Sequence, residues 1–90
     1  MNMNPARFYF ANLGADIVRC VAALDHGDEG RYRDSLARAR RTLGFLRASN
    51  RPEAYEEGLL LLRGLEYARQ DNTLDMFLDH TNKLITVFVR

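Results

Sequence analysis

The four residues Asp25-His26-Gly27-Asp28 interrupt a helical pattern that otherwise continues from Pro5 to Ala48. Gly27 can adopt the left-handed backbone conformation that ends a helix, and Asp28 has the short polar side chain that caps the start of the next one. If the chain stayed helical through Gly27, the first two helices would merge and three would remain in total. This short break therefore decides between a three-helix and a four-helix fold.

Apolar residues recur at steps of three and four on both sides of this break, which is the period of a helix with one buried face. Before the break, the predicted buried face consists of Phe10, Leu13, Ile17, Cys20, Val21 and Leu24. After the break, it consists of Tyr32, Leu36, Ala39, Leu43 and Leu46. The first half of the chain is therefore predicted to form two amphipathic helices.

Two more helices are predicted in the second half, separated by Asp71-Asn72-Thr73. The third covers about 52–70 after the break Ser49-Asn50-Arg51-Pro52, and its predicted buried face is Tyr55, Leu59, Leu62 and Leu65. The fourth is predicted to bury Leu74, Phe77, Leu78, Thr81, Leu84, Ile85 and Phe88. Residues 85–89 are rich in β-branched side chains, which favour strands, but a single strand would have no partner here. We therefore expect this end to be helical too.

Ninety residues are enough for one domain, so residues 1–90 are predicted to form a single unit. Short turns between consecutive helices favour antiparallel neighbours. The predicted fold is all-α, an antiparallel up-down-up-down four-helix bundle.

Composition favours a small cytoplasmic protein. Cys20 is the only cysteine, so no intramolecular disulfide can form, which fits a reducing compartment. The first residues lack the charged and apolar regions of a secretory signal, and no apolar run approaches the length of a membrane span. We expect no contact with a membrane.

Two of the predicted helices carry more apolar surface than a small monomeric bundle needs. The first has a second apolar stripe, well away from its buried face, made of Phe8, Ala11, Ala15, Val18 and Ala22. The third has a similar excess at Leu60, Gly64 and Tyr67. These eight residues are the predicted partner interface, and they favour a homodimer. The alternatives are an amphipathic helix of another protein, or cover from within the same chain.

The segment from Asp28 to Arg51 holds seven of the twelve arginines. Arg33, Arg40 and Arg47 are spaced by seven and form a basic stripe along one flank of the predicted helix, whereas Arg31 and Arg38 lie on the other flank. Residues 52–90 contain seven acidic side chains. The split between two flanks favours ion pairs between helices or subunits over nucleic-acid binding, which remains the alternative.

No catalytic, cofactor-binding or metal-binding motif accompanies these features. Asp71, Asp75 and Asp79 form a ladder at steps of four, which is typical of a solvated face or a match for arginines. Arg19 and His26 have a spacing similar to the Arg-x(4–6)-His motif of the helical RNases called HEPN domains. This chain departs from the family in two ways. Cys20 follows the arginine where the family usually has a polar residue, and Arg19 and His26 lie in the first third of the domain, whereas the family's motif usually lies late in it. The sequence therefore favours a non-catalytic interaction or adaptor module without a cofactor.

Overall fold

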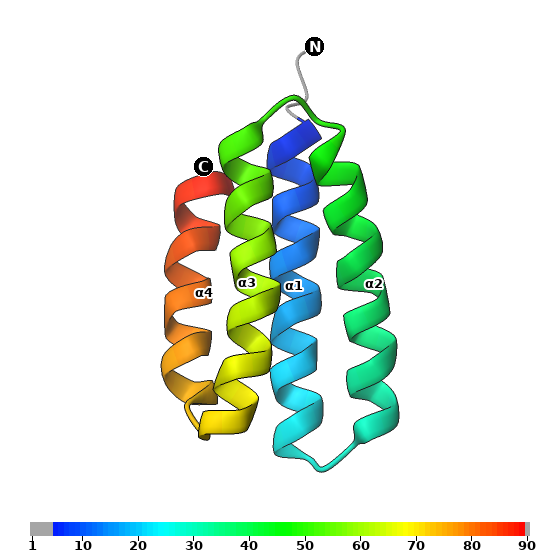
Figure 1. The fold of residues 1–90 in the computed structure, drawn as a ribbon, viewed down its shortest axis with the longest axis vertical. Coiled ribbons are helices and arrows are strands. Elements are labelled where there is room, and N and C mark those ends of the chain that lie inside the picture. Colours follow the sequence, from blue (N-terminus) through cyan, green and yellow to red (C-terminus); the bar gives the residue numbers. More distant parts are fainter. Residues whose placement is uncertain (1–4, 90) are drawn as a thin grey trace.

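The computed structural model describes residues 5–89, which form four helices joined by short turns (Figure 1). The helices are α1 (Pro5–Asp25), α2 (Glu29–Arg47), α3 (Pro52–Asp71) and α4 (Leu74–Val89). The described residues contain no strand, and residues 85–89 are helical. The predicted all-α fold with four helices is confirmed.

The break between α1 and α2 has the expected chemistry. Gly27 has φ of +69°, and the N–H of Asp28 donates to the carbonyl of Ala23 at 2.8 Å, which closes the end of α1. Asp28 then caps α2, because its Oδ1 accepts a bond from the N–H of Arg31 at 3.0 Å. The two helices are therefore separate, as the glycine and aspartate predict.

The other two turns use asparagines in the left-handed conformation. Asn50 (φ 63°) precedes α3, which begins at Pro52, where the missing N–H of proline removes no helical bond. Asn72 (φ 59°) ends α3, and the N–H of Thr73 donates to the carbonyl of Ala68 at 2.9 Å. These reversals bring each helix back against the one that precedes it in the chain.

The helix α1 packs against all three others, whereas α2 and α4 do not pack against each other in the described part of the chain. Figure 1 shows α2 and α4 at the two sides of the bundle, with α1 and α3 between them. α3 approaches α1 closely at Gly58, where an added Cβ would lie 2.8 Å from Leu13 Cδ2. In cross-section the bundle is therefore a rhombus whose short diagonal joins α1 and α3.

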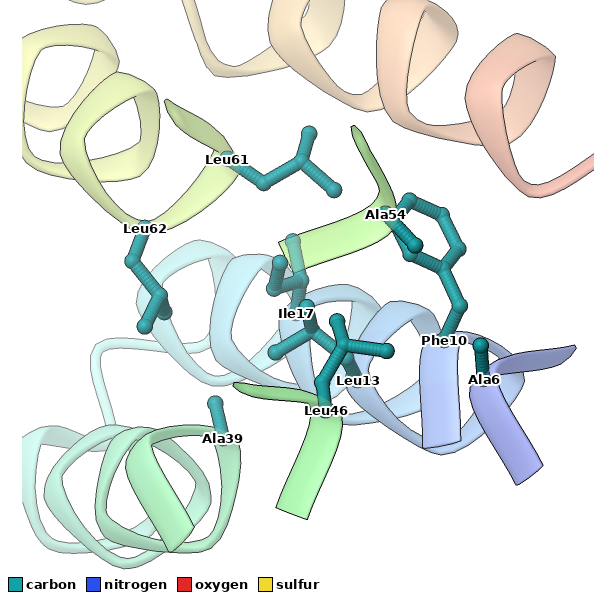
Figure 2. Close-up of a cluster of buried hydrophobic side chains, with 9 residues drawn as sticks. All are labelled: Ala6, Phe10, Leu13, Ile17, Ala39, Leu46, Ala54, Leu61 and Leu62. Atoms are coloured by element: carbon teal, nitrogen blue, oxygen red, sulfur yellow. The ribbon is translucent and has the colours of Figure 1, made fainter. Parts of the chain in front are cut away.

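The main core lies between α1, α2 and α3 (Figure 2). Its buried side chains come from α1, α2 and α3: Ala6, Phe10, Leu13, Ile17, Ala39, Leu46, Ala54, Leu61 and Leu62. A second cluster, nearer the α1–α2 turn, consists of Cys20, Val21, Ala23, Tyr32 and Leu65. All predicted core positions of α1 and α2 are buried or partly buried.

The predicted buried face of α3 is incomplete. Leu62 and Leu65 are buried as expected, and Tyr55 is partly buried and packs against the main core, whereas Leu59 is partly buried and belongs to neither core cluster. The buried side of α3 also includes Ala54, Gly58, Leu61 and Ala68. The small residues allow α3 to lie close to α1 and α2, and this turns Leu61 inward.

The helix α4 is attached by partly buried side chains. Thr81 is its one buried residue within 74–87, and its Oγ1 donates to the carbonyl of Phe77 at 2.9 Å. Ile85 lies against Gly14 of α1, and Phe77 lies against Gly64 of α3. The side chain of Phe88, another predicted core residue, lies outside the described part of the structure.

Candidate functional site

One side of α1 is left uncovered by the rest of the bundle. Contacts with α2, α3 and α4 occupy its other sides, through Tyr9, Leu13 and Gly14 respectively. The uncovered side carries the five predicted residues of the second apolar stripe. Phe8 is 52% exposed and Val18 36% exposed, Ala22 is exposed, and Ala11 and Ala15 are half-buried. We call these five residues the outer face of α1.

A groove runs beside this face, between α1 and α2. It consists of two open hollows of about 580 and 330 Å³ that share Arg19 and Arg38. Ala15 and Ala22 line it on the α1 side, and Arg31, Arg38 and Arg41 are among the residues that line it on the α2 side. The groove therefore combines small apolar residues with an arginine-rich rim.

Aspartates neutralise part of this rim. Arg19 forms an ion pair with Asp16 at 2.8 Å, and Arg31 lies 3.8 Å from its partner Asp28. Arg38 and Arg41 form no ion pair with any described residue. The unpaired positive charge of the groove is therefore concentrated on these two side chains.

Three aromatic rings lie at one end of the groove. Tyr9 stacks on Phe45 of α2 with ring centroids 5.4 Å apart, and Phe8 packs edge-on against Tyr9 at 5.5 Å. Phe45 is 57% exposed and lines the smaller hollow. Sequence periodicity did not single out Phe45, because its relation to this face depends on how α2 is rotated against α1.

The predicted interface residues of α3 lie on the other side of the molecule. Leu60 and Tyr67 are 57% and 67% exposed and are two helical turns apart on one side of α3. We call this side, which includes Gly64 at its edge beside Phe77, the outer face of α3. Because α1 and α3 meet through their inner sides, at Leu13 and Gly58, their outer faces point in opposite directions. A single two-fold interface can therefore contain one of these faces and not both.

The basic stripe on α2 borders α3. Arg40 forms an ion pair with Glu66 at 3.6 Å, while Arg33 and Arg47 are exposed and form no ion pair with described residues. A second ion pair joins the same two helices, with the arginine now on α3 and the glutamate on α2. Arg69 bonds to Glu29 and lies 4.6 Å from the ring centre of Tyr32. The bond to Glu29 raises the pKa of Arg69. Ion pairing between helices is thus present at two places, and one of them uses the predicted stripe.

Arg19 and His26 both line the larger hollow. The Nδ1 of His26 lies 2.7 Å from the carbonyl oxygen of Ala22 and donates to it, which leaves Nε2 as the acceptor of the neutral ring.

Cys20 has a different environment: it is fully buried, and burial together with the charge of Asp16 raises its pKa to about 11. A buried neutral thiol is a poor nucleophile, so Cys20 acts as a small apolar core residue.

Residues 5–89 contain no cluster of three or more His, Cys, Asp or Glu side chains arranged to hold a metal ion. Over the same residues, no helix has both the length and the apolar character needed to cross a membrane. Comparisons with protein-family models, curated proteins and solved structures gave no match.

Proposed function

We propose that the protein is a non-catalytic interaction module that associates with its own copies through the apolar outer faces of α1 and α3. One observation carries this proposal. The helix α1 is packed by three neighbours, yet its fourth side consists mainly of apolar residues, with Phe8 52% exposed. A monomer would be expected to present polar residues there, as α2 does at Asp34 and Arg41.

The exposed side chains are large enough for their burial to matter. Phe8, Val18, Leu60 and Tyr67 remain exposed, so packing among the described residues 5–89 does not cover them. At roughly 25 cal/mol per Å² of apolar surface, covering four such side chains contributes several kcal/mol to association. Ala11 and Ala15 allow a partner to approach the backbone of α1 closely.

Light scattering and sedimentation of the purified protein over micromolar to millimolar concentrations test this proposal. We expect a mass above that of one chain, and a decrease in mass for Val18→Lys or Leu60→Lys. Each variant places a hydrated ammonium group within an apolar contact. Ala37→Lys is the matched control, because Ala37 is an exposed helical residue outside both outer faces. A wild-type protein that remains monomeric throughout would contradict the proposal.

Nucleic-acid binding is the second candidate function, and the α1–α2 groove favours it. Arg19, Arg31, Arg38 and Arg41 line one groove, beside the rings of Phe8 and Phe45. Arginines next to aromatic rings suit single-stranded RNA, whose bases can stack. Three aspartates in the same groove reduce its positive charge, so we place this function second.

Fluorescence anisotropy with a labelled RNA at several salt concentrations tests the second candidate. Binding through this groove would weaken steeply with salt and in Arg38→Gln/Arg41→Gln, but not in the control Arg63→Gln. Recovery of the RNA after incubation separates binding from cleavage. Cleavage that disappears in His26→Ala would indicate an RNase instead.

A further inference from the structure

The two outer faces belong to halves of the chain with opposite charge. Residues 1–51, which include α1 and α2, contain nine arginines and five acidic residues. Residues 52–90, which include α3 and α4, contain four basic and seven acidic residues. The apolar outer face of α1 therefore lies in a positive half, and the apolar outer face of α3 lies in a negative half.

The groove beside the outer face of α1 presents its positive charge at specific positions. Arg38 lines both hollows and Arg41 lines the smaller one, and neither is paired with an acidic side chain of the described chain. The groove extends from Asn12 of α1 to His26, the first residue after α1, a separation of fourteen residue steps or about 21 Å at the helical rise. An occupant of matching length would be an amphipathic helix with apolar and acidic residues on one side.

The outer face of α3 has this composition. At steps of three and four along the helix, acidic residues stand on both sides of an apolar centre: Glu53, Glu56, Leu60, Gly64, Tyr67 and Asp71. Glu56 and Asp71 form no ion pair with described residues, although Arg63 lies near this side as well. The stretch from Glu53 to Tyr67 also spans about 21 Å.

We propose that copies of this protein associate head to tail, with the outer face of α3 from one copy seated in the α1–α2 groove of the next. This inference rests on the self-association proposed above and specifies its geometry. Leu60 and Tyr67 cover the alanines of the outer face of α1, while acidic residues at one end of the α3 face approach Arg38 and Arg41.

Like-with-like pairing is disfavoured by the same charges. A two-fold contact between α1 faces would bring Arg38 and Arg41 of both copies together, and a contact between α3 faces would bring their acidic ends together. Like charges in an interface cost free energy and suppress the wrong pairing. Because the two faces point in opposite directions, each added copy leaves one face of each kind free. The assembly then grows beyond a dimer unless it closes into a ring.

Mixing two variants by sedimentation velocity tests this geometry. Val18→Lys blocks the α1 face and leaves the α3 face intact, whereas Leu60→Lys does the reverse. Both introduce lysine, so the two altered faces cannot attract each other. We expect each variant alone to be monomeric and an equimolar mixture to form a one-to-one heterodimer that dissociates as salt is raised. Ala37→Lys should assemble like the wild-type protein.

Other results overturn the proposal in distinct ways. If one variant remains self-associated and the other does not, the contact is two-fold on a single face, and only the head-to-tail geometry fails. If both variants are monomeric and mixing produces no heterodimer, the geometry also fails. A monomeric wild-type protein overturns the self-association as well. Circular dichroism confirms that the variants are folded, and Ala22→Lys with Tyr67→Lys, both at exposed positions, form a second pair for the same measurement.

Discussion

α3 approaches α1 and α2 closely at Gly58, because this residue lacks a side chain. Substitution of Gly58 by alanine tests this explanation. An added Cβ at this position would lie 2.8 Å from Leu13 Cδ2, and 3.0 Å from both Leu43 Cδ1 and Leu46 Cδ2. These three leucines come from two different helices, so no single rotamer change relieves every contact. Overpacking of this kind typically costs about 1–3 kcal/mol.

Gly44 supplies the matched control, because it lies within α2 with no atom inside 4 Å of an added Cβ. Gly→Ala within a helix gains up to about 1 kcal/mol from backbone propensity at either position. We expect Gly44→Ala to raise the free energy of unfolding by about 0.5–1 kcal/mol, and Gly58→Ala to fall about 1–3 kcal/mol below it. Urea unfolding followed by circular dichroism, at one low protein concentration, measures both. Equal stabilisation by the two substitutions would refute the close approach.

Two further predictions concern the α1–α2 end of the bundle. Asp28→Ala removes the bond from the N–H of Arg31 and should lower the free energy of unfolding by about 1 kcal/mol. Asp28→Asn keeps a capping oxygen and should remain more stable than Asp28→Ala. Equal urea midpoints for the two variants would contradict the cap. Because burial raises the pKa of Cys20 from 9.0 to about 11, its thiolate fraction at pH 8 should be roughly a hundredfold below that of an unperturbed thiol. Alkylation of Cys20 should be slow in the folded protein, faster as the pH rises toward 11, and fast in urea. Similar alkylation rates in the folded and unfolded protein would show instead that Cys20 is accessible.

The positions of the turns could be predicted from the sequence because their causes are local. Gly27 and Asn72 adopt positive φ, and Asp28 and Pro52 begin helices, each through interactions with residues a few positions away. Such features depend on residue type and order alone. They fix the number of helices before any tertiary contact is known.

The orientation of α3 could not be predicted in the same way. Residues 59–62 are four consecutive leucines, so any side of this helix that faces the core would contain some of them. Hydrophobic periodicity therefore cannot decide which side of α3 is buried. The choice is made by Ala54, Gly58 and Ala68, whose small size permits close packing. Small residues add little to a hydrophobic pattern, and their role becomes visible only with the facing helix in place.

The residues that line the α1–α2 groove also depend on how the helices face one another, which residue spacing does not give. Phe8, Ala15 and Ala22 could be assigned to one side of α1 from spacing alone. That Arg38 and Phe45 lie beside them follows from the rotation of α2 about its axis, which the core residues Ala39 and Leu46 determine. Opposite directions of the α1 and α3 faces likewise follow from the contact at Gly58. Residue spacing alone allows a two-fold dimer that buries both faces in one interface, whereas the opposite directions of the two faces do not.

The area available also bears on how association and stability are connected. A standard contact removes about 800 Å² from each partner, so a copy that uses both faces would bury roughly a quarter of its 6027 Å² surface. A chain of ninety residues has a small core, and α4 contributes one fully buried side chain within 74–87. Binding that requires the folded bundle stabilises it by mass action, so unfolding of an associating protein depends on its concentration. Apolar outer faces on α1 and α3 would therefore stabilise this small fold as well as select its partner.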